Sequence, residues 1–550
     1  MLRRQGGVQG AGTRPQGGTM GGRSSSAYSL LLILSQALWV LPAAQPASAQ
    51  VVLPPNFISP DVPHDVPTGP SASIQDLAIF AWREFIALNW VAMDPATTTG
   101  NPRGRPNVNL GVNAGFLSIK ADQNGNFPLL VWHTYRHKNE LFPAAPAQTD
   151  ASFDSSMPTY NYQSPTPKAA PGANFQLFNN LDETSEIGLC QMFAHNTTRI
   201  AYEAKVSRAL FDYANQNQLT KHDADGTYPA LTAATQNTMY YLALYGGTCG
   251  ASTNIPIVSL PCGDAAVAGD AGEGAIEIKA AWRQLNSAEA ASGRFFMRSV
   301  LFYQGEPGNQ TYNNAVYGLV ALHITHKTKS FPTFVFASWE QIDNYAEGQS
   351  QITPNTQDLK FINLGYPGSS IYPNNPPPPN IPVTRNHPIH SQIPPVNSAV
   401  HTAFTNIDPS TVWQYYKLIG VQATPVNGPP SKTAPSDDIS YYYLANIVVE
   451  TNQTLQNFAG SLPLITEVPL LNVYLNGAPG SPFQMGGCQG CHGAAGQSNG
   501  GDMSVLIGFG PSNAAGPPES IDNAPETAAK SYAVRSYGLN RARSLGLIPQ

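Results

Sequence analysis

Apolar side chains recur at helical spacing near the start of the chain. In residues 73–93, the apolar positions that share one helical face are Ile74, Leu77, Ala78, Ala81, Phe85 and Leu88. Ser73 precedes them as a candidate N-cap, and Asp76 follows three residues later. A cap followed by this spacing predicts an amphipathic core helix. A second amphipathic stretch, residues 199–216, predicts another helix.

The middle of the chain is instead rich in β-branched and aromatic residues. Within residues 274–285, Ile276 and Ile278 alternate with Glu277 and Lys279, which is the period of a strand with two different faces. Further segments of this kind, each bounded by turn residues, are 295–305, 315–328, 332–344 and 411–422. Together they predict an antiparallel sheet.

The pattern changes again toward the C-terminus. Residues 365–396 are rich in Pro and Asn, include four consecutive prolines, and predict a long surface loop. Residues 440–458 and the Ala-rich stretch 524–545 predict helices. We therefore expect the α+β class, with a large mixed domain over residues 50–458 that holds an antiparallel sheet, followed by a small, mainly helical region over 459–550.

Residues 1–49 have the pattern of an export signal. An apolar run from Ala27 to Leu41 follows Arg23, and the small residues Ala47 and Ala49 come after the run. This order is typical of a secretory signal peptide cleaved near Ala49. Because the apolar core is about a dozen residues long and a bilayer span needs about 20, an N-terminal membrane anchor is the weaker alternative. We expect a periplasmic or secreted mature chain without a transmembrane segment.

The charge of the chain argues against one class of partner. Only 12% of the residues are charged, the formal net charge is −6, and no cluster of Lys or Arg follows Arg23. Proteins that bind nucleic acid contact its phosphates with a basic face, so we expect no nucleic acid as a partner. The sequence also has no phosphate-binding loop, nucleophile elbow or dinucleotide-binding glycine motif, which leaves hydrolase and nicotinamide chemistry without support.

One short string carries specific chemistry. Cys488, Cys491 and His492 form C-x-x-C-H, the attachment signature of a c-type haem. Two thiols three residues apart on one helical turn can add to the two vinyl groups of a haem, and the adjacent imidazole then binds the iron. A zinc site would need a second Cys/His pair, but His492 is the last histidine of the chain. We expect one covalently bound haem c here, which makes 459–550 a cytochrome c-like haem-binding region.

The second axial position determines what such a haem does, because a filled site favours electron transfer and an open one permits ligand binding. Met503 is the soft donor that follows His492, and the intervening chain is long enough to pass around a porphyrin edge. Met503 is therefore our candidate second iron ligand, although the sequence fits a plain core residue equally well. Met485 is an alternative, as is His323 or His326, which we expect on opposite faces of one strand.

Three of the five cysteines lie outside the haem motif. Only one disulfide can form among Cys190, Cys249 and Cys262 within one chain. We favour the pair Cys249 and Cys262, because it closes a short loop. Cys190 would then be a buried thiol.

Other polar residues admit two interpretations each. His133 and His137 are four apart and would share a face if their segment were helical, but core histidines are the simpler interpretation than a metal site. His387 and His390 lie in the proline-rich tract, where we expect solvated surface residues. A set of polar residues near two strand tryptophans either lines a substrate pocket or forms a buried salt-bridge network; these are Glu277, Lys279, Arg283, Glu340 and Asp343.

Several longer strings point to one group of proteins. AWREFIALNW, IEIKAAWR, GLVALHITHKT, FASWEQIDN, LANIVVET and CQGCH together run through most of residues 75–492. Through them the chain resembles a group of large bacterial exported cytochrome c-type proteins with a single haem motif near the C-terminus. The resemblance implies covalent haem on Cys488 and Cys491 with His492 as axial ligand, and it implies no substrate.

Three functions fit these features. The first hypothesis is electron transfer, in which the large domain docks a redox partner protein or a small-molecule electron donor. The second is a periplasmic oxidoreductase that oxidises a small substrate in the large domain and releases the electrons through the haem. The third is a haem peroxidase or gas sensor with an open sixth position. Whether the chain is an enzyme therefore stays open.

Overall fold

The computed structural model describes part of the chain. The described residues are 51–100, 102–123, 125–143, 148–155, 191–193, 200–240, 248–250, 254–267, 272–304, 311–344, 362–364, 389–423, 446, 488, 492 and 500–510. The predicted signal peptide and the predicted helix 524–545 lie outside this set, and so does the predicted helix 440–458 apart from Asn446.

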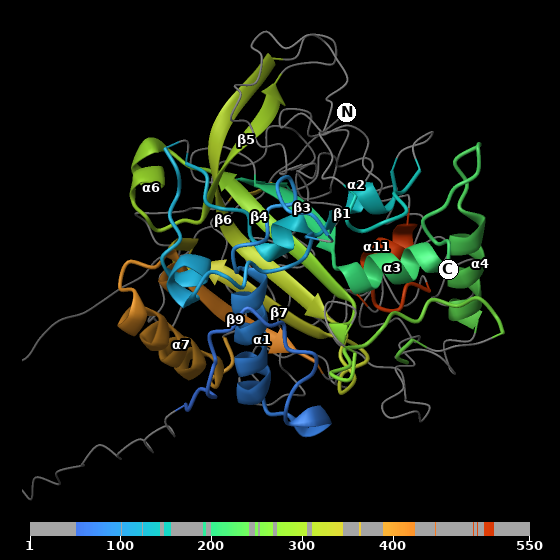
Figure 1. Cartoon of the computed structure of the whole chain (residues 1–550), viewed down its shortest axis with the longest axis horizontal. Coiled ribbons are helices and arrows are strands. Elements are labelled where there is room, and N and C mark those ends of the chain that lie inside the picture. The colour runs from blue at the N-terminus through green and yellow to red at the C-terminus, as the bar shows by residue number, and fades with distance from the viewer. Residues whose placement is uncertain are drawn as a thin grey trace, which may run out of the picture. The chain divides into compact units, whose positions relative to one another are not determined.

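An antiparallel sheet of seven strands organises the described residues (Figure 1). The strand order is β1, β3, β4, β6, β7 and β9, and β5 pairs with the first half of the long strand β6. Their bounds are β1 Arg136–His137, β3 Ala201–Val206, β4 Ile276–Gln284, β5 Met297–Gln304, β6 Thr311–His326, β7 Val335–Gln341 and β9 Tyr416–Gln422. A separate pair joins β2 (Gln191–Phe193) to β8 (Ile362–Leu364). The predicted antiparallel sheet and the mixed α+β class are confirmed.

The predicted first helix is also confirmed. It is α1, Ile74–Leu88, and Ser73 caps it through a reciprocal capping box with Asp76. All six apolar positions of the predicted stripe are buried, and α1 packs against β7, β9 and α7 (Ile393–Ile407). The other helices are α2 Lys138–Leu141, α3 Arg208–Gln216, α4 Pro229–Tyr240, α6 Ser287–Ala291 and α11 Val505–Phe509; short helical turns are η1 Gly69–Ser71, η2 Asn113–Leu117, η3 Val131–Thr134, η5 Ile342–Asn344 and η6 Val412–Tyr415.

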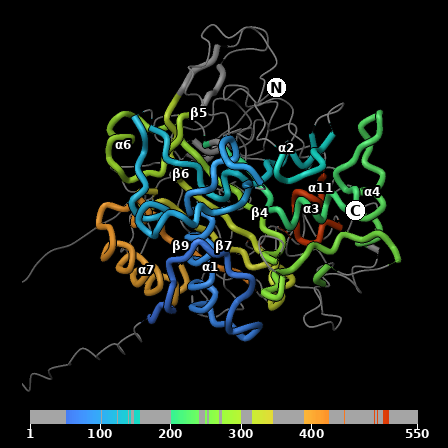
Figure 2. The backbone as a smooth tube through the Cα atoms, viewed as in Figure 1, coloured from blue at the N-terminus to red at the C-terminus, as the bar shows by residue number. Residues whose placement is uncertain are grey.

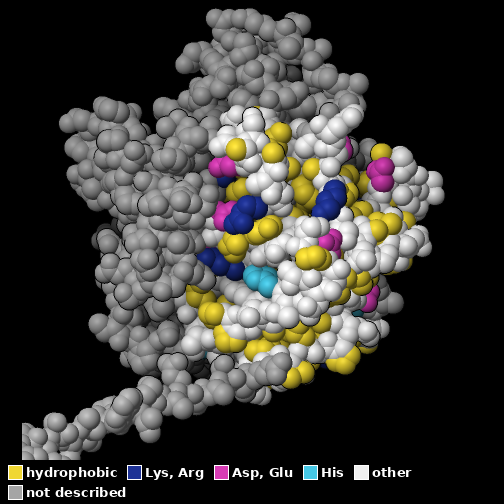
Figure 3. All heavy atoms as spheres, turned by 90° about the vertical axis from the view of Figure 1, so that its left-hand side faces the viewer, with side chains coloured by type: hydrophobic (Ala, Val, Ile, Leu, Met, Phe, Trp, Pro, Cys, Tyr) yellow, Lys and Arg dark blue, Asp and Glu magenta, His cyan; other side chains and the backbone are white. Residues whose placement is uncertain are grey.

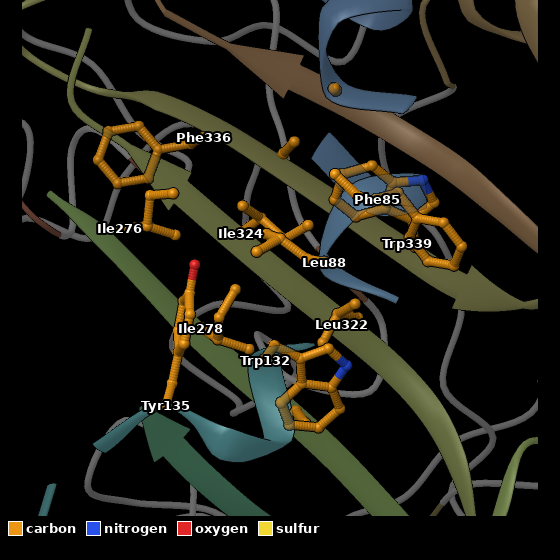
Figure 4. Packing of buried hydrophobic residues seen from close by; sticks show 14 of the residues in the cluster. Phe85, Leu88, Trp132, Tyr135, Ile276, Ile278, Leu322, Ile324, Phe336 and Trp339 are labelled. Atoms are coloured by element: carbon orange, nitrogen blue, oxygen red, sulfur yellow. The ribbon is translucent and has the colours of Figure 1, made fainter. Parts of the chain in front are cut away.

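The face of the sheet that α1 covers, here named the first face, is apolar. Phe85 of α1 lies against Trp339 of β7, with ring centroids 5.1 Å apart, and Figure 4 shows Leu88 beside Leu322 and Ile324 of β6. All five side chains are 0% exposed. Because each buried side chain of this size contributes about 1.5–3 kcal/mol, this packing fixes α1 to the sheet.

The opposite face of the sheet, here named the second face, is mostly polar. Strand alternation and register place a set of side chains together on it; these are Glu277 and Lys279 of β4, His323 and Thr325 of β6, and Phe336, Ser338 and Glu340 of β7. Glu277, His323, Thr325, Phe336, Ser338 and Glu340 are buried. A polar face that is buried must have another part of the chain over it.

Two sequence predictions need correction. The stretch 199–216 is not one helix: residues 201–206 form strand β3, in which Tyr202, Ala204 and Val206 alternate with Glu203 and Lys205, and only the second half is helix α3. The predicted surface loop 365–396 overlaps helix α7, in which Pro394 and Pro395 occupy the first turn, where a missing N–H costs no helical hydrogen bond. Residues 365–388 lie outside the described set.

Segments far apart in the sequence meet near the start of β4. The tube in Figure 2 shows α11 beside α3 and α4, and the backbone of Gly510, after α11, closely approaches Leu231 of α4.

On the face shown in Figure 3, basic and acidic side chains lie next to each other among uncharged ones. Among the described helices, none is both long enough and apolar enough to cross a bilayer.

Candidate functional site

Two residues of the haem motif are described, Cys488 and His492. Each has helical backbone, and His492 is half-buried. Cys488 is 6% exposed, and it belongs to the same hydrophobic cluster as the sheet, together with Met503, Leu506 and Ile507. Cys491 lies outside the described residues. The domain boundary at residue 459 stays a prediction.

The ring of His492 is oriented by a main-chain carbonyl. Its Nδ1 lies 2.8 Å from the carbonyl oxygen of Met503. A carbonyl only accepts hydrogen bonds, so Nδ1 must carry the proton, and Nε2 is the nitrogen with a lone pair in the neutral ring. Metal-binding histidines usually have this arrangement, in which one ring nitrogen donates to a carbonyl and the other binds the metal.

The second face of the sheet supplies the surroundings of His492. The ring of Phe336 meets the His492 ring edge to face, with centroids 4.8 Å apart. Burial lowers the pKa of His492 to about 4; the hydrogen bond to the Met503 carbonyl opposes this shift, and the charge of Lys279 adds to it. At neutral pH the ring is therefore uncharged, which is the form that binds metals.

The two histidines of β6 face opposite sides, as their spacing predicts. His323 lies on the second face, and burial, Lys279 and His492 lower its pKa to about 3. His326 lies on the first face, where its Nδ1 is 2.5 Å from Glu84 Oε1 and its ring stacks on Phe80. His326 is therefore wrong as a candidate second ligand for an iron at His492, whereas His323 lies within electrostatic reach of that ring.

The turn after the haem motif is fastened to the rest of the protein by polar contacts that sequence reasoning missed. Asp502 accepts hydrogen bonds from the main-chain N of Leu260, at 2.6 Å, and from Lys327 Nζ. Ser504 caps α11 and donates to Glu277 Oε1 on the second face. The glycine-rich string GGDMS indicates a tight turn but gives no sign of these distant partners.

The predicted disulfide is confirmed. Cys249 and Cys262 are bonded, with Cα atoms 5.2 Å apart. The loop that they close contains Leu260, the residue that donates to Asp502. Cys190 lies outside the described residues.

The remaining histidines include one correction. His390 is 2% exposed, not solvated as predicted, and its Nδ1 accepts from the main-chain N of Gln392 at the start of α7; His387 lies outside the described residues. His133 is a core histidine: it is fully buried, its Nδ1 accepts from the Leu130 N, and its ring lies 4.0 Å from that of Trp132. Within the described parts of the chain, no group of three or more His, Cys, Asp or Glu is placed to hold a metal ion.

Two of the polar residues near the strand tryptophans form ion pairs. Arg283 pairs with Glu289, and Asp343 pairs with Arg294, and each pair has one partly exposed partner. Glu277, Lys279 and Glu340 share the second face.

Comparison of the chain with known protein families, curated proteins and solved structures gives no match.

Proposed function

We propose that this chain is an exported c-type cytochrome with one haem, which transfers single electrons to or from a redox partner protein or a small-molecule donor. Cys488 and Cys491 would anchor the haem through thioether bonds, and His492 Nε2 would bind the iron. The resemblance to bacterial exported cytochrome c-type proteins and the signal-like residues 1–49 support the same proposal.

One observation carries the proposal: in a C-x-x-C-H string, the histidine donates through Nδ1 to the Met503 carbonyl. This hydrogen bond fixes the tautomer and presents Nε2 for a metal. The residues around the ring fit a haem, because Phe336 offers an apolar surface beside His492, and Cys488 belongs to the same hydrophobic cluster as Phe336. A solvated histidine in a loop would support no such conclusion.

The haem, when bound, supplies a one-electron couple at its iron. The chain's own residues set the conditions for that couple. Each thiol would add across one vinyl group, forming a carbon–sulfur bond while its hydrogen passes to the neighbouring carbon. Met503 orients the imidazole through its carbonyl, and Phe336 covers one side of the His492 ring with an apolar surface. Apolar surroundings of this kind tune the reduction potential.

The large sheet is part of the proposed site. Phe336 comes from β7 and Glu277 from β4, and Lys327 directly follows β6. All three contact the segment that carries or follows the motif. A change in the contacts between the sheet and a bound partner would therefore alter the surroundings of the haem. This is how a large domain that docks a redox partner would be coupled to a small haem segment.

The test uses the full chain, exported in a bacterial host that attaches haem c. We expect a reduced-minus-oxidised spectrum of a c-type haem that cycles reversibly by one electron. His492→Ala should abolish or strongly alter this spectrum. The matched control His401→Gln should leave it unchanged, because His401 lies on α7 and its Nε2 donates to the main-chain carbonyl of Tyr416 on β9, at 2.7 Å. A colourless parent protein would refute the proposal, and carbon monoxide binding by the reduced protein would favour an open-site haem protein over electron transfer.

A further inference from the structure

The turn that follows the haem motif has an unusual backbone. Asp502 and Met503 both have positive φ, 55° and 68°, in the left-handed region that costs an L-residue conformational energy. Asp tolerates this region better than most residues, but a long unbranched side chain such as that of Met503 rarely adopts it. Such a conformation persists only where the surroundings enforce it, and it occurs most often at functional sites.

A buried ion pair holds this turn. The Asp502 carboxylate pairs with Lys327 Nζ, and the side chains are 2% and 0% exposed. The same carboxylate oxygen accepts from the main-chain N of Leu260 at 2.6 Å. Removed from water, charge-assisted hydrogen bonds of this kind are strong and geometrically demanding.

The ion pair is in turn anchored at two places. Lys327 directly follows β6, and its main-chain N donates to the Ala275 carbonyl at 2.9 Å beside β4. Its Nζ also donates to the Thr248 carbonyl at 2.5 Å. Thr248 and Leu260 lie next to the two ends of the Cys249–Cys262 disulfide loop. Asp502 is therefore fixed both to the sheet and to a covalently closed loop.

This arrangement fixes the position of the Met503 main-chain carbonyl. The Met503 oxygen accepts from His492 Nδ1 at 2.8 Å, so it lies on the side of the imidazole away from any metal at Nε2. An iron held at Nε2 would lie beyond the far side of the imidazole ring from that oxygen, and a further ligand on the iron would be more distant still. The Met503 sulfur is only three bonds from its own Cα, and the side chain is too short to span this path around a porphyrin.

We propose that Met503 serves the haem site through its main-chain carbonyl and not as the sixth iron ligand, and that Asp502 and Lys327 are positioning residues that hold this carbonyl against His492. The proposal rests on the proposed function, because it assumes that His492 binds the iron. A hydrogen bond from Nδ1 to a carbonyl makes the imidazole a stronger donor to iron. A stronger donor favours the ferric state, so loss of this hydrogen bond should raise the reduction potential.

The test compares three variants of the full haem-loaded chain. Met503→Leu keeps the carbonyl and removes the sulfur. The double variant Asp502→Asn/Lys327→Met removes both buried charges together, so that neither partner is left unpaired and the net charge is unchanged. The matched control, Arg294→Met/Asp343→Asn, removes another ion pair. This pair joins Arg294 to Asp343 of η5, the short helical turn that follows β7.

For Met503→Leu we expect no change in the axial-ligand bands, and no thioether-to-iron charge-transfer band in either parent or variant. For the Asp502/Lys327 variant we expect a higher reduction potential. We also expect exchange of the His492 Nδ1 proton in the reduced protein, followed by NMR, to become at least about tenfold faster. The control should match the parent in both measurements.

A thioether band in the parent that disappears in Met503→Leu would overturn this inference and leave the proposed function standing. An Asp502/Lys327 variant with parental potential and parental proton exchange would overturn the positioning role. A parent chain without haem would refute both the proposed function and this inference.

Discussion

The rings of Phe336 and His492 meet edge to face, with centroids 4.8 Å apart and planes at 61°. Phe336 belongs to β7, in the middle of the chain, and His492 belongs to the haem motif near its end. Through this contact a strand of the large sheet directly shapes the environment of the proposed iron ligand. The two parts therefore do not behave as independent units at this site.

Replacing Phe336 should change both the redox properties and the stability of the protein. In Phe336→Ala, water reaches the site and stabilises the more positively charged ferric form, so the reduction potential should fall. The free energy of unfolding should fall by about 3–5 kcal/mol. Redox titration and thermal unfolding measure the two effects. Phe404→Ala is the control, because Phe404 is equally buried, on α7; it should lose similar stability and keep the parental potential. A parental potential in Phe336→Ala would contradict the contact's role.

His326 should affect stability but not the haem. Its Nδ1 lies 2.5 Å from Glu84 Oε1 on the first face, and burial raises the pKa of that carboxyl. His326→Leu leaves the Glu84 carboxyl without this partner, which should lower the free energy of unfolding by about 1–3 kcal/mol. The visible spectrum of the haem should stay parental. A changed axial-ligand band in this variant would show that the assignment of His326 to the first face is wrong.

Glu277 should make stability depend on pH. Burial raises its pKa from 4.5 to about 7, against the opposing hydrogen bond from Ser504. A carboxyl with a raised pKa in the folded state stabilises the protein below its ordinary pKa, and this contribution is lost as pH rises through about 7. Glu277→Gln removes this loss, so the variant should gain about 3 kcal/mol relative to the parent between about pH 4 and about pH 8.

Thermal unfolding of parent and Glu277→Gln across this pH range measures the difference. The comparison is made as variant minus parent, because Asp502 also has a pKa raised by burial, to about 6, and contributes equally to both proteins. A difference that stays constant with pH would contradict the burial of an ionisable Glu277 on the second face.

The disulfide should support both stability and the turn after the haem motif. The bonded cysteines are 13 residues apart, and opening a loop of about this length costs about 3 kcal/mol. Cys249→Ser/Cys262→Ser should therefore unfold at lower temperature. Because the loop carries the Leu260 N–H that bonds Asp502, the reduction potential should rise in the same direction as in the Asp502/Lys327 variant. A melting temperature equal to that of the parent would contradict the stabilising role of the disulfide. A lowered reduction potential would contradict its role in holding the turn.

The features that the sequence predicted well are those written in local patterns. The stripe from Ile74 to Leu88 and the capping box at Ser73 are set within one segment, and α1 forms there with the predicted residues buried. Alternation in β4 likewise places Ile276 and Glu277 on opposite faces. The loop between Cys249 and Cys262 was predictable because few pairings were possible.

The features that the sequence did not predict depend on contacts between distant segments. Residues 201–206 alternate apolar and polar side chains and form strand β3 paired with β4, but they stand directly before helix α3, and the longer stretch was predicted as one helix. From the local sequence, Asp502 is indistinguishable from an ordinary turn residue, because its partner Lys327 is 175 positions away. Helix α7 begins with Ile393 and two prolines, which the sequence analysis took for the end of a loop. For Asp502 the deciding interaction lies outside any local sequence window.

The most direct test of the central claim is the mass of the peptide that contains Cys488 and Cys491, released by proteolysis from the exported, purified protein and washed with acidified organic solvent. A haem joined by two thioether bonds survives this treatment, so the account predicts a peptide heavier by one haem, with the mass increase located on both cysteines. A peptide with the mass of its amino acids alone would contradict the account.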